Sequence, residues 1–72
     1  NNQKYIGKTI QILVEEFLES HLFAGRTKFQ APEVDGISYI STEQSPLELK
    51  IGSFADMRVT DAMEYDLMGV AV

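Results

Sequence analysis

The sequence of 72 residues contains no cysteine and a single histidine, His21. The lack of cysteine excludes disulfides, thiolate zinc sites and cysteine-bound iron–sulfur clusters within the chain. One histidine is also too few for a metal site built from imidazole ligands. We therefore expect no metal or redox chemistry in these residues, and the absence of cysteine is compatible with a cytosolic origin.

The chain also has no long hydrophobic run. No apolar stretch approaches the ~20 residues that a membrane-spanning helix requires, and no secretory signal pattern is present at the start. We therefore expect no membrane segment. The chain begins with Asn1-Asn2 and no initiator Met, as expected for a piece of a larger protein. Its apolar content of 44% is typical of a globular fold, and its length fits one small domain.

Positively charged residues are scarce. Six Lys and Arg stand against eleven Asp and Glu, which gives a formal net charge of −5. Domains that bind nucleic acid are usually basic, because Lys and Arg displace the counterions of phosphates. An acidic surface repels RNA at long range and attracts a basic partner. The charge thus favours a basic protein partner over RNA, with solubility alone as the alternative explanation.

Residues 8–22 fit two periodic patterns. Ile10, Ile12 and Val14 alternate with other residues, as in a half-buried strand. A larger set of apolar residues is spaced as on one face of a helix: Ile10, Leu13, Val14, Phe17, Leu18 and Leu22. Periodicity alone leaves strand and helix open for this segment.

The rest of the chain has the pattern of short strands separated by turns. Gly25 is expected at a barrel corner or bulge, and Pro32 with Asp35-Gly36 indicates a loop. Gly52 is expected in a turn, and Gly69 is expected to break the last strand. The later strands are predicted at 37–41, 54–62 and 65–72. With two strands before them, they predict an all-β fold, a small closed antiparallel barrel of five strands.

Two pairs of carboxylates are the first candidate site residues. Glu33 and Asp35 lie in the predicted loop, and Glu64 and Asp66 lie beside the last turn. Such pairs can act as acid and base or bind calcium, but no nucleophile or calcium-loop pattern accompanies them. Two interpretations stay open. The aspartates hold turns through hydrogen bonds, or the four carboxylates contact basic side chains of a partner.

Arg26 and the aromatic residues complete the candidates. Arg26 is expected to pair with Glu33 or Asp66, with phosphate binding as the alternative. For RNA, the candidates are Arg26 and Lys28, with Tyr39 and Tyr65 as stacking platforms, although such tyrosines are often core residues. The phenylalanines are expected in the core: Phe17, Phe23, Phe29 and Phe54.

Several short motifs resemble a known family. Gly7-Lys8-Thr9 and Gly25-Arg26-Thr27 are similar to segments of TRAM domains. Two further segments resemble the carboxy-terminal TRAM domain of RimO-type methylthiotransferases: Ala31-Pro32-Glu33-Val34-Asp35-Gly36 and Glu64-Tyr65-Asp66-Leu67. The resemblance implies an OB-like barrel over 8–72, after a lead-in over 1–7 from a preceding domain. It favours a strand over 8–16, a turn near Glu19 and a second strand from about His21.

The resemblance also implies a function. The parent would be a cytoplasmic radical S-adenosylmethionine enzyme with two 4Fe-4S clusters, which adds a methylthio group to the β-carbon of an aspartate in a small-subunit ribosomal protein. This non-catalytic fragment would hold that basic protein through Glu33, Asp35, Glu64, Asp66 and Arg26, next to the preceding radical S-adenosylmethionine domain. The alternatives are an RNA-binding TRAM domain of a MiaB-type enzyme, which modifies transfer RNA, and a lid that stabilises the parent fold.

Overall fold

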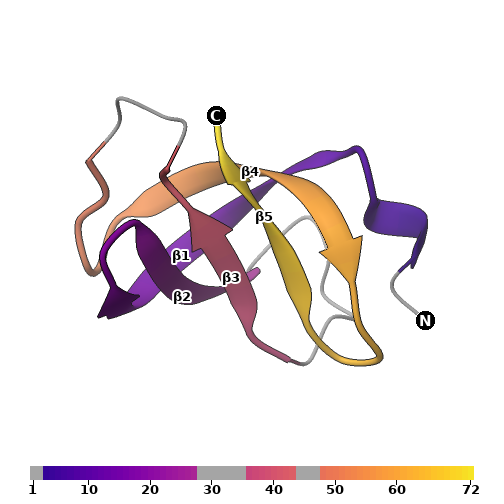
Figure 1. Cartoon of the computed structure of the whole chain (residues 1–72), viewed down its shortest axis with the longest axis horizontal. Coiled ribbons are helices and arrows are strands. Elements are labelled where there is room, and N and C mark those ends of the chain that lie inside the picture. Colours follow the sequence, from indigo (N-terminus) through magenta and orange to yellow (C-terminus); the bar gives the residue numbers. More distant parts are fainter. Residues whose placement is uncertain (1–2, 28–35, 44–47) are drawn as a thin grey trace.

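Five strands form a closed barrel in the computed structural model, which describes residues 3–27, 36–43 and 48–72 (Figure 1). The order around the barrel is β1-β2-β3-β5-β4. A short 3-10 helix, η1 (Gln3–Tyr5), precedes the strands. Their bounds are Thr9–Glu19 for β1, Leu22–Thr27 for β2, Ser38–Ser41 for β3, Phe54–Ala62 for β4 and Leu67–Ala71 for β5. The predicted five-stranded barrel is confirmed.

One strand pair differs from the predicted antiparallel arrangement. β3 and β5 run parallel, whereas the other four pairs are antiparallel. The order of the strands explains this exception. The chain leaves β3, closes the barrel beside β1 as β4, and then returns as β5 into the remaining gap. Since β4 is antiparallel to β1 and β5 is antiparallel to β4, β5 must point the same way as β3.

The segment with ambiguous periodicity is a strand followed by a turn. Ile10, Ile12 and Val14 are buried and alternate along β1, which confirms the strand over the helix. β1 extends three residues beyond the predicted end at residue 16, and the turn to β2 lies at residues 20–21. His21 has a positive φ of 65° in that turn. The side chain of His21 is exposed.

The core lies inside the barrel and includes a residue of the predicted lead-in. Its buried cluster consists of Tyr5, Ile10, Ile12, Ile40, Met57, Val59, Leu67 and Ala71. Tyr5 is only 6% exposed, because η1 packs against β4 and the Gly7 backbone N–H donates to Val59 O at 2.8 Å. The structured part of the chain thus begins before residue 8. No helix among the described residues is long and apolar enough to span a membrane.

Two phenylalanines that were predicted in the core lie at the surface. Phe17 is 57% exposed and Phe54 is 50% exposed. The register of β1 shifts after Val14, so the end of β1 extends past the buried cluster. Phe23 is half-buried against the core and makes an edge-to-face contact with Phe17 at a centroid distance of 5.3 Å. Phe29 lies outside the described residues.

Gly25 lies where two strands approach too closely for a side chain. A Cβ atom built at this position would overlap the carbonyl of Leu13 and the side chain of Ile12. The register shift of β1 follows immediately, which confirms the predicted bulge. Gly69, by contrast, does not break the last strand as predicted. β5 is continuous through it, and the irregularity lies opposite, between Val59 and Asp61 of β4.

Candidate functional site

The structure brings the end of the predicted loop to the turn before β5. Gly36 lies directly against Tyr65 and Asp66, where a Cβ atom would overlap the Tyr65 carbonyl and the Asp66 carboxylate. The Ile37 backbone N–H donates to Asp66 Oδ1 at 2.8 Å, and Leu67 N–H donates to Ile37 O at 3.1 Å. Asp66 therefore ties the start of β3 to the start of β5 through a bond between segments that are distant in the sequence. Glu33 and Asp35 lie outside the described residues.

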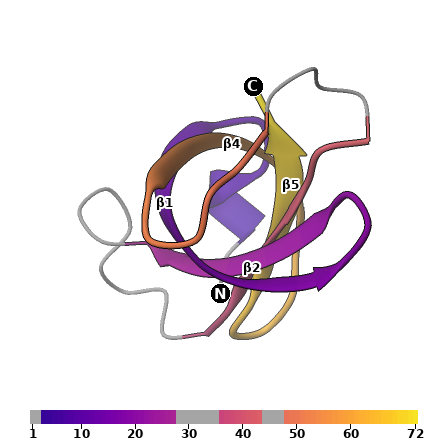
Figure 2. The same ribbon diagram turned by 90° about the vertical axis from the view of Figure 1, so that its left-hand side faces the viewer.

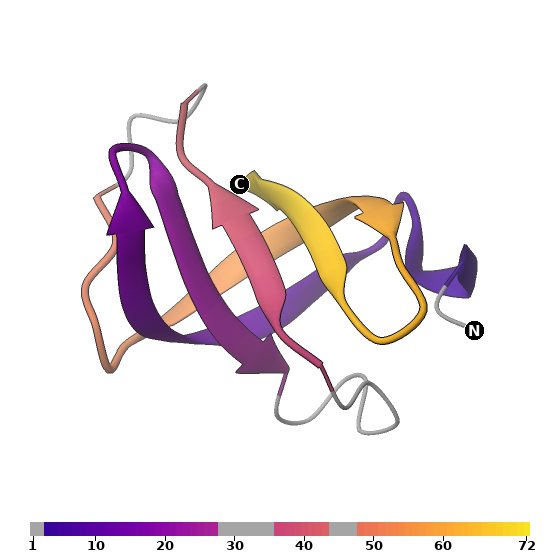
Figure 3. The ribbon, with the colours of Figure 1, turned by 60° about the horizontal axis from the view of Figure 1, so that its bottom comes forward.

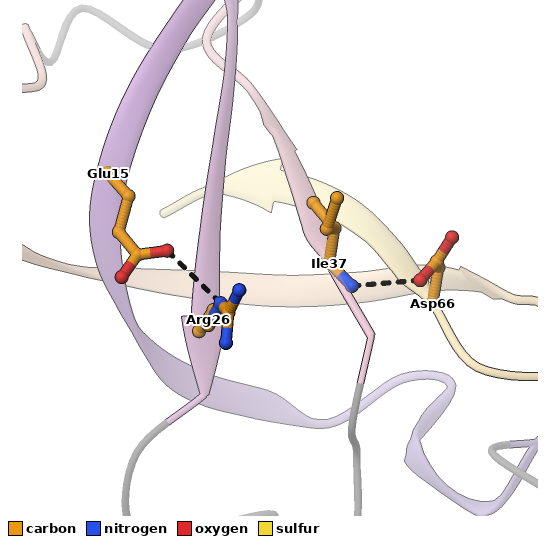
Figure 4. A network of polar contacts seen from close by, with 4 residues as sticks. All are labelled: Glu15, Arg26, Ile37 and Asp66. Carbon is orange, nitrogen blue, oxygen red and sulfur yellow. Dashed lines mark hydrogen bonds and ion pairs between the residues drawn. The ribbon is translucent and has the colours of Figure 1, made fainter.

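Arg26 forms an ion pair with a residue that was not predicted. Its Nε lies 3.3 Å from Glu15 Oε1, as Figure 4 shows beside the bond from Ile37 to Asp66. The prediction of Asp66 as partner is wrong. Arg26 pairs across the strands with Leu13, and the irregularity after Val14 brings Glu15 to the same outer side of the barrel. Both side chains are substantially exposed, so this pair contributes little to folding stability.

A row of cross-strand neighbours follows the outer surface of β2, β3 and β5. The register aligns Glu16, Ala24, Tyr39, Met68 and Asp61. Directly opposed residues share one side of a sheet, and the neighbours of Tyr39 and Met68 along their strands point into the core. The row thus has carboxylates at both ends and uncharged side chains in its middle.

A second row runs beside the first one. Arg26, Ile37 and Asp66 occupy the next outward positions of β2, β3 and the start of β5, and Figure 4 shows them in this order. Ile37 is 40% exposed and Met68 is 38% exposed. We call these two rows the outer face. In OB-folds, the face of strands 2 and 3 is the surface that binds oligonucleotides and oligosaccharides.

The outer face contains a shallow depression beside the bulge of β1. Its volume is about 100 Å³, which exceeds the ~30 Å³ share of one water molecule. The lining residues are Glu15, Glu16, Ala24, Gly25, Arg26 and Ile37. Two carboxylates therefore meet at its rim while one guanidinium is already paired, so the depression offers unpaired negative charge to a ligand.

The charges are distributed unevenly over the described residues. Three cations of the described residues, Lys4, Lys8 and Arg58, belong to neighbouring backbone segments at one end of the barrel, where Val59 N–H donates to Lys8 O at 2.9 Å and η1 packs against β4. Arg26 and Lys50 belong to other parts of the fold. Carboxylates gather at the β1–β2 hairpin, where Glu16 and Glu19 are exposed. Glu43 lies near the hairpin turn, because the N–H of the preceding Thr42 donates to His21 O at 2.9 Å. Sequence reasoning missed this group, although the spacing of Glu15, Glu16 and Glu19 could have indicated it. Lys28 lies outside the described residues.

The remaining candidates lie at the opposite end of the outer face. Glu64 and Tyr65 are exposed in the turn before β5, and Tyr39 is half-buried on the face itself. The structure thus brings Glu64, Tyr65 and Asp66 together, with Arg26 one strand beyond Ile37. These residues can bind a ligand through charge and apolar contact.

The residues of this chain do not fit the cofactors that the resemblance implies for the parent. The sequence has no cysteine to hold an iron–sulfur cluster. Within residues 3–27, 36–43 and 48–72, no group of three or more His, Asp or Glu side chains is placed to hold a metal ion. We therefore derive no chemical step for this chain from a cluster or a metal.

Comparisons with known proteins agree with the fold. A family model described as TRAM domain matches residues 6–72. Over 94% of its length, the chain is 44% identical to "Ribosomal protein uS12 methylthiotransferase RimO" of Clostridioides difficile. Over 97% of its length, it is 43% identical to the protein of the same name from Desulfitobacterium hafniense. The chain spans 15% of the length of each of these relatives.

Proposed function

Because the chain belongs to the TRAM domain family, we propose that it is the substrate-recognition domain of a RimO-type methylthiotransferase and that it binds ribosomal protein uS12. The names of the relatives supply the substrate. The observation that carries the proposal is the outer face, where carboxylates border uncharged side chains and the guanidinium of Arg26 is paired with Glu15. A basic protein surface complements this arrangement.

The charge of the chain gives the proposed binding a physical basis. A net charge of −5 on a small domain creates a negative potential that steers a basic partner toward the surface and raises the association rate. Ile37, Tyr39 and Met68 then offer apolar area in the middle of the face, and burial of such area contributes about 25 cal/mol per Å². Charge would orient the partner, and apolar contact would retain it.

The proposal assigns the chemistry to the rest of the parent protein. The parent would be a cytoplasmic radical S-adenosylmethionine enzyme that holds two 4Fe-4S clusters and S-adenosylmethionine in domains preceding this chain. Residues 1–7 would lead from the preceding radical S-adenosylmethionine domain into the TRAM domain of 8–72, with Tyr5 of this lead-in packed in the barrel core. This chain would act by holding uS12, without catalytic residues of its own.

One observation favours the alternative of RNA binding. Tyr65 is exposed beside the outer face and Tyr39 lies on it, so both could stack on bases. RNA binding also needs clustered cations that track the phosphates. Arg26 is instead paired with Glu15 on this face, and the row of Tyr39 ends in carboxylates at Glu16 and Asp61.

Charge reversal in the predicted loop tests whether that loop belongs to the binding surface. We expect Glu33→Lys combined with Asp35→Lys to weaken binding of purified uS12 by about tenfold, because like charges then face each other at the interface. Isothermal titration calorimetry at low salt measures the dissociation constant. Glu48→Lys combined with Asp56→Lys makes the same charge change at other exposed positions; it is the control and should change affinity less than about threefold. Equal losses in both proteins would mean that net charge alone matters; unchanged affinity in the double variant would remove the loop from the interface.

A further inference from the structure

The second half of β1 has a strand edge without a neighbour. β1 pairs with β4 only over Thr9–Leu13. Val14 adds two bonds to the turn before β4, since its N–H donates to Ser53 O at 2.9 Å and its O accepts from Gly52 N at 2.7 Å. Beyond Val14, β1 continues to Glu19 with β2 on one side only. In the part of the chain that the structure describes, no backbone group bonds to the other edge of residues 15–19.

Figure 2 shows how the β1–β2 hairpin projects to one side of the barrel. Figure 3 shows β2 between β1 and β3, so that β1 is the outermost strand of the hairpin. Every strand of the closed barrel has a neighbour on each side, but several pairings cover only part of a strand. Residues 15–19 are such a stretch, since they pair with β2 and not with β4.

Large apolar side chains are exposed around this edge. Phe17 and Leu18 belong to the edge segment itself. Ile51 precedes the turn that bonds to Val14, and Phe54 pairs with Leu13 where the ladder with β4 ends. Proteins usually protect a free edge with charged side chains, proline, a bulge or a covering segment, and this edge has glutamates and register shifts of that kind. Its large exposed apolar side chains are in addition typical of a surface that receives a partner.

The charge of the edge indicates what kind of strand it receives. Glu15, Glu16 and Glu19 lie on the edge segment, and Glu43 lies near the hairpin turn. A second copy of this chain, paired through the same edge, would place these carboxylates opposite one another, which destabilises a sheet. A segment with lysine or arginine opposite the glutamates would gain favourable cross-strand pairs.

We propose that residues 15–19 bind an extended basic segment of a protein partner by strand addition. The inference rests on the proposed function and adds the mode of recognition. Backbone hydrogen bonds to the free edge would supply affinity, and alternate side chains would supply specificity. Because side chains alternate along a strand, the preferred segment would alternate basic residues, which meet the glutamates, with apolar residues, which meet Phe17.

Backbone methylation of a model peptide tests this mode. The probe is a heptapeptide of alternating Lys and Val, added to isotopically labelled chain and followed by NMR. We expect amide shifts centred on residues 15–19. In an added strand, alternate N–H groups face the protein, so N-methylation of one alternate set should weaken binding at least about tenfold, whereas methylation of the other set should change it less than about threefold. The two methylated peptides carry the same charge and serve as controls for each other.

The outcomes separate this inference from the proposed function. Equal effects of the two methylation patterns, or shifts confined to other residues, would overturn strand addition even if uS12 binds and charge reversal weakens it. Failure of uS12 to bind, with the methylation difference intact, would overturn the proposed partner and leave the strand site standing. Sedimentation of the chain alone should show a monomer; a dimer with shifts at residues 15–19 would replace the basic segment by a second copy.

Discussion

Reversing two carboxylates of the β1–β2 hairpin, with Glu16→Lys and Glu19→Lys together, should weaken the binding of uS12 about 30-fold. Glu16 stands at the end of the outer row and at the rim of the depression, and Glu19 continues the edge segment. The double change replaces two attractive charges by two repulsive ones within a Debye length of about 10 Å of a bound partner. Like-charge contacts at interfaces are strongly unfavourable.

Folding should be little affected by this change, because both side chains are exposed. Thermal unfolding followed by circular dichroism checks this, and the binding loss is measured by calorimetry at two salt concentrations. The weakening should shrink at high salt, where screening removes charge effects. Glu48→Lys together with Asp56→Lys makes the same charge change at other exposed positions. A loss as large in this control would assign the effect to net charge and not to the hairpin.

The second large effect is an expected loss of folding stability. Gly25→Ala should destabilise the barrel by about 3 kcal/mol, the upper range for overpacking a tight site. The new Cβ would overlap the backbone carbonyl of Leu13, and a carbonyl in a strand ladder moves only if the strands separate. For a domain of this size, such a loss lowers the melting temperature by about 12–24 °C.

Gly7→Ala is the matched control for this prediction. The change is chemically the same, but no atom lies within 4 Å of a Cβ at Gly7. Its φ of 88° makes a side chain unfavourable, at a cost of about 1–2 kcal/mol. Gly25→Ala should therefore melt well below Gly7→Ala in the same scan. Similar melting temperatures for the two variants would show that β1 and β2 do not approach each other as closely at Gly25 as described.

The alternation of apolar and polar residues predicted most of the strands, but it could not predict which strands pair with one another. In β4, the alternation of apolar and polar residues correctly predicted that Met57 and Val59 are buried. For residues 8–22, the family resemblance decided between strand and helix. The parallel pairing of β3 with β5 depends on strand order, which no local pattern encodes. Phe17 and Phe54 were assigned to the core because aromatic residues are usually buried, but both are exposed. For Phe17 the reason is the register shift after Val14, which carries the end of β1 past the core.

The candidate site was predicted in its residue types and less well in its contacts. For Asp66, the sequence left a hydrogen bond in a turn and a contact with a partner open, and the structure shows a bond to the N–H of Ile37, which is distant in the sequence. Among the described residues, Arg26 pairs with Glu15 and not with Asp66, because the bulge of β1 determines which glutamate reaches it, while Glu33 lies outside the described residues. The acidic hairpin was missed because three glutamates in a strand with mixed periodicity could equally be a solvated face of a helix.

A comparison of the affinities of the chain for uS12 and for RNA tests the central proposal most directly. The dissociation constants of the chain for uS12 and for bulk transfer RNA are measured at about 150 mM salt, the physiological range, with an unrelated protein of similar positive charge as a specificity control. An acidic outer face predicts that uS12 binds at least about 100-fold more tightly than transfer RNA and more tightly than the control protein. Binding of transfer RNA as tight as that of uS12 would contradict the account.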